Sequence, residues 1–169
     1  KIDVRPVICP PQTSSYLENN ILMFYTGIAR FATHIAEEKI KNIASCDKDA
    51  LLTKMYNLVF EAEKVLGQND PEKVLKEFGD LLHTSWTCKK KISQKITQTV
   101  IDEAYEKALE AGAYGGKLCG AGYGGFLIFA VPPEKHQSVR EALKHFQEVN
   151  FSFCPEGSNI IYYQPEKTQ

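Results

Sequence analysis

The stretch that decides the fold is GGKLCGAGYGGFLIFAV, residues 115–131. Gly120, Gly122 and Gly125 match the letters of G-x-G-x-x-G, the fingerprint of dinucleotide-binding loops. In that fingerprint a helix follows the glycines, because the pyrophosphate binds at the helix N-terminus. Here the apolar residues 126–131 follow, rich in aromatic and branched side chains, and they predict a strand. The pattern therefore disfavours a dinucleotide site, and a Walker loop is excluded because no G-K-[ST] follows.

The glycine density of residues 120–125 still needs a physical reason, since four of these six residues are glycine. Each glycine costs about 0.5–1 kcal/mol of backbone entropy relative to alanine. A two-residue hairpin turn needs only one or two glycines. The density is typical of a loop that a ligand or another backbone approaches closely, with N–H groups free to point at it. A ligand-proximal loop is favoured over a purely structural hairpin, and the pattern does not identify the ligand.

Composition places the chain among ordinary soluble domains. It has 169 residues, 43% of them hydrophobic, and a formal net charge of −1. The near-neutral charge argues against binding to nucleic acid or to a membrane surface. No apolar run approaches the roughly eighteen residues of a membrane span, and no signal peptide opens the chain. The chain begins at Lys1 with the strand-like IDVRPVI, so we expect it to be part of a longer protein.

The cysteines predict a reduced, cytoplasmic protein. They are odd in number, lie far apart and form no C-x-x-C pair, which disfavours a zinc site or a disulfide framework. The five are Cys9, Cys46, Cys88, Cys119 and Cys154.

Periodicity and cap signals predict an α+β fold rather than a doubly wound parallel sheet, because strands group at both ends of a helical block. Pro71 suits the first position of a helix that Asn69 or Asp70 could cap. Ser14 or Ser15 could cap a short helical turn. Strands are expected at 2–8, 20–27, 117–120, 125–131, 149–154 and 158–163, and helices at 30–42, from Asp47 or Asp49 to 66, 71–92, 97–111 and 132–146.

Residues 116–134, GKLCGAGYGGFLIFAVPPE, resemble the third signature of the GHMP-type small-molecule kinases, approximately K-L-x-G-A-G-x-G-G followed by a strand. This family includes galactokinase, homoserine kinase and mevalonate kinase. ILMFYTGIAR at 21–30 is similar to LLLFYTGISR of the sugar-kinase branch that includes D-glycero-D-manno-heptose 7-phosphate kinase. Residues 81–93 and 101–118 also resemble that branch. The similar segments follow one another in the same order in both sequences, and together they cover nearly the whole chain.

The resemblance implies that residues 1–169 form a single domain, the C-terminal lobe of a two-lobe kinase. It implies a ferredoxin-like antiparallel sheet with helices packed on one face and an inserted helical block. The family's main phosphate-binding motif, P-x-x-x-G-L-G-S-S, belongs to the N-terminal lobe and does not occur in this sequence. We therefore expect an N-terminal lobe of the same protein as the partner that completes the ATP site.

The resemblance also implies roles for individual residues. The segment lining the ATP side of the cleft would be Gly120, Ala121, Gly122, Tyr123, Gly124 and Gly125. Tyr123 departs from the family pattern, because many relatives have glycine there. Arg30 and Lys117 could bind the sugar phosphate, or each could be a surface residue. Lys89, Lys90 and Lys91 suit a helix C-terminus, where cations are favoured, and a substrate role is their less favoured alternative. His83 with Trp86 suits a core face. No carboxylate pair or Cys/His/Asp set indicates catalysis or a metal site within the chain.

The function implied by the resemblance is that of an ATP- and Mg²⁺-dependent sugar kinase. The expected reaction transfers the γ-phosphoryl group of ATP to the anomeric hydroxyl of D-glycero-D-manno-heptose 7-phosphate. A fucose-type or other GHMP kinase is the alternative within the class. A non-catalytic, ferredoxin-like ligand-binding or regulatory domain is the alternative from another class. In every kinase interpretation the isolated chain is expected to be inactive.

Overall fold

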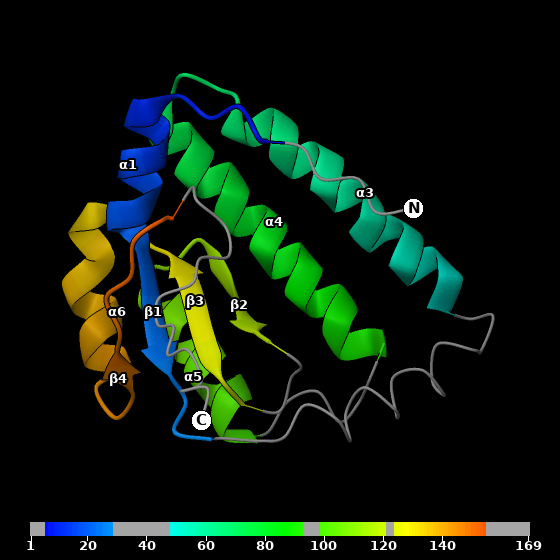
Figure 1. The fold of residues 1–169 in the computed structure, drawn as a ribbon. Helices are drawn as coiled ribbons and strands as arrows, with labels where there is room; N and C mark the ends of the chain where they lie inside the picture. Colours follow the sequence, from blue (N-terminus) through cyan, green and yellow to red (C-terminus); the bar gives the residue numbers. More distant parts are fainter. Residues whose placement is uncertain (1–5, 29–47, 93–98, 121–123, 155–169) are drawn as a thin grey trace, which may run out of the picture.

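The computed structural model describes residues 6–28, 48–92, 99–120 and 124–154 of the chain, and its elements confirm the α+β class. Four strands form one antiparallel sheet in the order β2-β3-β1-β4 (Figure 1). The elements are α1 (Pro11–Asn20), β1 (Ile21–Tyr25), α3 (Asp49–Leu66), α4 (Pro71–Ile92), α5 (Thr99–Glu110), β2 (Gly115–Cys119), β3 (Phe126–Ala130), the 3₁₀ helix η2 (Pro133–Lys135), α6 (His136–Ala142) and β4 (Gln147–Glu148).

The register of the sheet places the glycine loop beside the end of β1. In the β2–β3 hairpin, Cys119 pairs with Phe126, so residues 120–125 form the connection. In the neighbouring β1–β3 pair, Phe126 also lies opposite Tyr25, the last residue of β1. The loop and the turn after β1 therefore lie at the same end of the paired strands, although they are about a hundred residues apart in sequence.

Alternate residues of the central strands supply the main core. Leu22 and Phe24 of β1 point to the same face as Leu127 and Phe129 of β3, as the two-residue period of a strand requires. On this face they pack with residues of α5 and α6, and with Trp86 of α4. A second cluster lies on the other face of the sheet, where the intervening strand residues point, and joins α1 and the first turns of α4 to the sheet. Its buried members are Leu17, Ile21, Val74, Leu75 and Ala130.

Helix α4 runs along β2 and packs on α3 with its other side (Figure 1). Two glycines allow it to lie close to the strand. A Cβ at Gly79 would lie 2.7 Å from Cβ of Tyr114, and a Cβ at Gly115 would overlap the carbonyl of Gly79. Glycine is required at both positions because the helix and strand backbones nearly touch.

The predicted helices and strands around this contact are confirmed. Helix α3 begins at Asp49 and ends before Gly67, and α4 begins at Pro71. Asp70 caps α4, since its Oδ1 accepts a hydrogen bond of 3.1 Å from the N–H of Lys73. The strand predicted at 20–27 is β1, and those at 117–120 and 125–131 are β2 and β3.

Several expectations at the two ends of the chain were wrong. Residues 6–8 form no strand, because Pro6 and the Pro10–Pro11 pair leave few N–H donors for pairing. Ser14 and Ser15 do not cap a helix; they lie inside α1, which begins with Pro11 at its first position.

The C-terminal part of the described chain also differs from the expectation. The strand expected at 149–154 is absent: the strand paired with β1 covers residues 147–148, followed by one more backbone hydrogen bond, from the N–H of Val149 to the carbonyl of Met23 at 2.8 Å. The helix expected at 132–146 divides into η2 and the shorter α6. The elements expected at 30–42 and 158–163, and residues 2–5 of the first expected strand, lie outside the described residues.

Within the described ranges, no helix is long and apolar enough to cross a membrane. The four described cysteines, Cys9, Cys88, Cys119 and Cys154, are free thiols.

The contact between α4 and β2 yields a stability prediction. We expect Gly79→Ala to lower the free energy of unfolding by about 1–3 kcal/mol, because the added methyl group must displace Tyr114 or Ala130. In most helix interiors the same substitution stabilises. Chemical denaturation of the purified protein measures the change.

Gly67→Ala is the matched control. Gly67 follows α3 with ordinary helical backbone angles, φ −79° and ψ −3°. A Cβ there would meet only atoms at 3.7–3.8 Å. Its stability should be unchanged or raised by up to about 1 kcal/mol. Equal effects of the two substitutions would contradict the close approach of α4 to β2.

Candidate functional site

The described ends of the glycine loop have backbone requirements that explain three of its glycines. Gly120 has φ +89° and Gly125 has φ +114°, in the region that L-residues with side chains rarely adopt. Gly124 needs the absence of a side chain for another reason, because a Cβ there would lie 2.5 Å from the carbonyl oxygen of Ile28. The loop is thus built to lie against the turn that follows β1.

Thr26, the first residue after β1, joins that turn to the loop. Its N–H and its hydroxyl both donate to the carbonyl of Gly125, at 2.9 and 3.0 Å. The N–H of Gly125 donates back to Thr26 Oγ1 at 3.0 Å, and the N–H of Ile28 lies 3.4 Å from the same oxygen. Thr26 is only 7% exposed. One buried hydroxyl therefore fixes the end of the loop to β1.

Lys89 of α4 holds the beginning of the loop. Its Nζ donates to the carbonyl of Gly120 at 2.9 Å, with a longer contact of 3.4 Å to the carbonyl of Leu118. The ammonium group also lies 6.0 Å from the ring centroid of Trp86, a favourable cation–π distance. Lys90, by contrast, forms an ion pair of 3.3 Å with Asp102 of α5. Among the described contacts of the lysines at the end of α4, that of Lys89 is the one made to the loop backbone.

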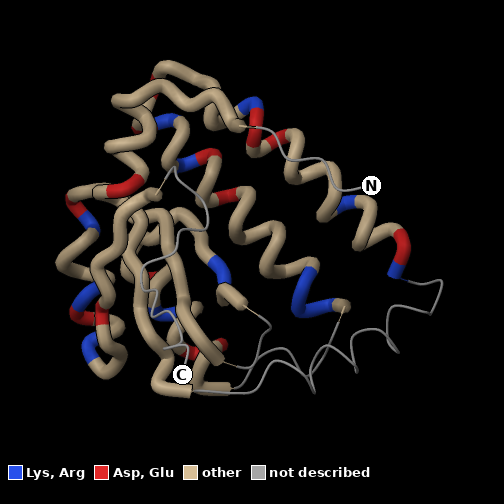
Figure 2. Tube along the Cα trace, viewed as in Figure 1, with Lys and Arg blue, Asp and Glu red and all other residues tan. Residues whose placement is uncertain are grey.

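Lys117 of β2 lies on the same side of the loop. Its side chain is half-buried, with only a long hydrogen bond of 3.5 Å from its Nζ to Ser85 Oγ. Burial raises the pKa of the neighbouring Cys119 thiol, and the positive charges of Lys117 and Lys89 partly offset that increase. Figure 2 shows lysine and arginine positions on β2 and at the C-terminal end of α4. The start of the loop is therefore an electropositive region, which suits an anionic ligand.

Trp86 belongs to the core, as expected, whereas His83, expected on the same core face, is exposed. Trp86 is fully buried and packs near Tyr105 of α5. The Tyr105 hydroxyl donates to the carbonyl of Gly116 at 3.0 Å and lies 2.9 Å from His83 Nδ1. Burial is the main cause that raises the pKa of Tyr105, so its hydroxyl stays protonated. His83 and Tyr105 therefore support the strand before the loop rather than forming an acid–base pair.

Four of the residues proposed from the sequence, Arg30, Ala121, Gly122 and Tyr123, lie outside the described residues. In the sequence, Arg30 comes two positions after Ile28. The carbonyl of Ile28 lies against Gly124. Of the described members, Gly120, Gly124 and Gly125 lie together where β2 ends and β3 begins, and Lys117 lies in the middle of β2. Thr26 was missed because a single threonine carries no signal, although it lies in the YTG stretch of residues 25–27.

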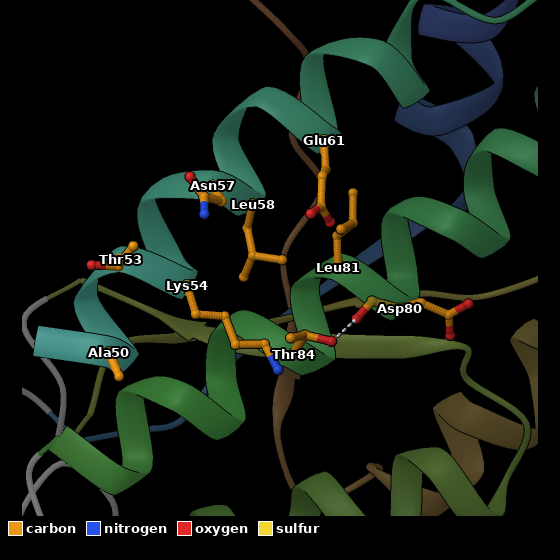
Figure 3. A pocket seen from close by; sticks show the side chains of 9 residues that line it. All are labelled: Ala50, Thr53, Lys54, Asn57, Leu58, Glu61, Asp80, Leu81 and Thr84. Atoms are coloured by element: carbon orange, nitrogen blue, oxygen red, sulfur yellow. Dashed lines mark hydrogen bonds between the residues drawn. The ribbon is translucent and has the colours of Figure 1, made fainter. Parts of the chain in front are cut away.

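A hollow lies elsewhere, between α3 and α4, on the far side of α4 from β2. Figure 3 shows Lys54 and Glu61 of α3 at its rim and Leu58 and Leu81 within it. The Thr84 hydroxyl there donates to the Asp80 carbonyl of its own helix at 2.9 Å. This hollow contains opposite charges and no loop backbone. The glycine loop is therefore the stronger candidate for an anion site.

Comparison with known proteins identifies a family that the chain resembles. Residues 68–148 match the family model GHMP kinases C terminal. The chain is 32% identical over 171 residues to a D-glycero-alpha-D-manno-heptose 7-phosphate kinase of Campylobacter jejuni, covering 93% of this chain and 46% of the relative. It is 27% identical to a bifunctional fucokinase/GDP-fucose pyrophosphorylase of Arabidopsis thaliana, covering 91% of this chain and 15% of that protein.

A solved structure shows the same fold. The mevalonate kinase of Methanococcus jannaschii superposes with a TM-score of 0.66 at 22% identity, over 83% of this chain and 42% of the kinase. The chain thus spans less than half the length of the proteins it matches. The family model includes α4, α5 and the glycine hairpin, and the Campylobacter relative extends the match to nearly all of the chain. Residues 68–148 therefore belong to the C-terminal domain family of the GHMP kinases, and the similarity to the heptose 7-phosphate kinase continues over nearly the whole chain.

Proposed function

We propose that this chain is the C-terminal lobe of a two-lobe, ATP-dependent sugar-phosphate kinase, in which residues 120–125 line the ATP side of the cleft. The observation that carries the proposal is the glycine loop, held to β1 by Thr26 and to α4 by Lys89 beside an electropositive strand end. An N-terminal lobe of the same protein would supply the remaining phosphate contacts and the catalytic groups. The cytoplasmic location stays a prediction.

The proposed role of the loop follows from the chemistry of phosphoryl transfer, which depends mainly on positioning and on stabilising charge. A loop without side chains allows backbone N–H groups to approach phosphate oxygens. The N–H of Gly125 is already used by Thr26, so we assign Gly125 to shaping the loop. We assign the phosphate contacts to the residues before it, from Gly120 to Gly124.

Mg²⁺ would neutralise charge on the phosphates during transfer. Among the described residues, no group of His, Cys, Asp or Glu could hold a metal ion. We therefore assign the ligands of Mg²⁺ to the phosphates of ATP and to the N-terminal lobe.

The proposed acceptor is D-glycero-D-manno-heptose 7-phosphate, phosphorylated at its anomeric hydroxyl. The proposal rests on the Campylobacter relative, a heptose 7-phosphate kinase by name, which is similar over nearly the whole chain. Arg30 and Lys117 would bind the phosphate group of the sugar. A fucose-type substrate is the second candidate, favoured by the similarity to the Arabidopsis fucokinase.

A substrate panel tests this function. The full-length protein containing this chain is incubated with ATP, Mg²⁺ and one acceptor at a time: heptose 7-phosphate, fucose, galactose or mevalonate. We expect ADP release to be fastest with heptose 7-phosphate, and ³¹P NMR should place the new phosphate on the anomeric oxygen. Turnover with fucose alone would show that the proposed substrate is wrong and would still support the proposed kinase activity. A folded protein without turnover on any acceptor would favour the non-catalytic alternative.

The isolated chain should release no ADP above background with any of these acceptors, because the proposed phosphate-binding motif and catalytic groups lie in the N-terminal lobe. Mixing the chain with a separately expressed N-terminal lobe is the companion measurement. ATP turnover by the chain alone would contradict the assignment of the catalytic groups to the other lobe.

Arg30→Ala tests the sugar-phosphate site. Charge-assisted hydrogen bonds contribute about 1.5–3 kcal/mol, so the KM for the sugar phosphate should rise about tenfold or more, with a smaller change in the KM for ATP. Arg140→Ala is the matched control: it removes a 2.9 Å ion pair with Glu148 on a half-exposed surface, and both KM values should stay unchanged. An unchanged KM for the sugar phosphate in Arg30→Ala would mean that Arg30 is an ordinary surface arginine without a role in substrate binding.

A further inference from the structure

The hydrogen-bonding capacity of the Thr26 hydroxyl is fully used at the junction between β1 and the glycine loop. The hydroxyl donates to the carbonyl of Gly125 and accepts from the N–H of Gly125, both at 3.0 Å. Its second acceptor position faces the N–H of Ile28 at 3.4 Å. A hydroxyl offers one donor and two acceptor sites, so none is left for a ligand. Thr26 therefore acts on the protein itself.

Glycines with positive φ need such external contacts to keep one conformation. Gly120 and Gly125 have access to more backbone conformations than any other residue type, so the loop is not fixed by its own chain. The described contacts fix it from outside: Lys89 holds the carbonyl of Gly120 at 2.9 Å, and Thr26 holds both the carbonyl and the N–H of Gly125. Thr26 is the more buried anchor, and it contacts both backbone polar groups of Gly125.

We propose that Thr26 is a positioning residue for the nucleotide, which acts by fixing Gly125 and through it the loop. This inference rests on the proposed function, because the loop is assigned there to the phosphates of ATP. The hydroxyl holds the loop where its backbone meets the triphosphate, without contacting ATP. A small displacement of a positioning element is enough to slow a reaction strongly. Loss of the hydroxyl should therefore affect ATP more than the sugar phosphate.

The test uses Thr26→Val in the full-length protein. Valine keeps the β-branched shape and the backbone N–H bond to Gly125, and it removes only the hydroxyl. We expect the KM for ATP to rise about five- to tenfold with a fall in kcat, and the KM for the sugar phosphate to change less than about twofold. Thr26→Ser, which retains the hydroxyl, should recover most of the loss.

Thr13→Val is the matched control. Thr13 of α1 is fully buried, and its hydroxyl donates to the carbonyl of Gln68 at 3.1 Å. It lies in the helix that precedes β1, whereas Thr26 follows the strand at its other end (Figure 1). The same chemical change there should lower the melting temperature without altering the KM for ATP. Equal ATP kinetics in Thr13→Val and Thr26→Val would overturn the positioning role.

Hydrogen–deuterium exchange separates this inference from the proposed function. In peptides that contain Gly120, Gly124 and Gly125, exchange should be faster in Thr26→Val than in the parent protein and unchanged in Thr13→Val. If the parent protein phosphorylates no acceptor, the proposed function fails, and exchange alone decides whether Thr26 positions the loop. If the loop peptides exchange at the same rate in Thr26→Val as in Thr13→Val, the inference is overturned in that case too.

A milder substitution covers the possibility that Thr26→Val does not fold. Thr26→Cys replaces the hydroxyl by a thiol, which is a weaker hydrogen-bond donor and acceptor. The KM for ATP and the exchange of the loop should change in the same direction by a smaller factor. Parental values for both in Thr26→Cys would count against the positioning role.

Discussion

The close approach of α4 to β2 is the constraint on which the rest of this domain depends. A helix and a strand can lie this near each other only where neither has a side chain, and Gly79 and Gly115 provide that absence. Because the helix then runs along the strand, Trp86 two turns later is fully buried against the sheet. Another turn on, Lys89 reaches the carbonyl of Gly120. A packing requirement in the middle of the helix therefore places a charged side chain at the start of the loop.

The position of the loop is determined from two independent directions. The hairpin register fixes where β2 ends and β3 begins, and the pairing of β3 with β1 brings Thr26 to the same edge. Helix α4 adds the contact from the side through Lys89. Lys89 and the hydroxyl of Thr26 thus both act on the backbone of the loop. In this domain the glycine loop is supported by side chains that are themselves committed to protein contacts.

Local signals were sufficient to predict the central elements and the strand that follows the glycine loop. Pro71 with Asp70 marked the start of α4, and the apolar residues after Gly125 showed that a strand follows the glycines. The ends of the chain were predicted less well, because prolines near residues 6–11 and the early end of pairing at Glu148 override the strand-forming side chains. The roles of Thr26 and Lys89 could not be predicted, since each depends on a contact with a residue 99 or 31 positions away.

The structure also changes the physical argument for the glycine density. On sequence alone, four glycines in six residues favoured a nearby ligand over a plain turn. Positive φ angles now account for Gly120 and Gly125, and the carbonyl of Ile28 accounts for Gly124. These three glycines are therefore needed for the backbone path of the loop beside β1. Each costs about 0.5–1 kcal/mol of backbone entropy. A simple hairpin turn would connect the same strands with fewer glycines. The sequence therefore maintains a specific loop position at this edge of the sheet, and a defined position is what a phosphate-binding backbone requires.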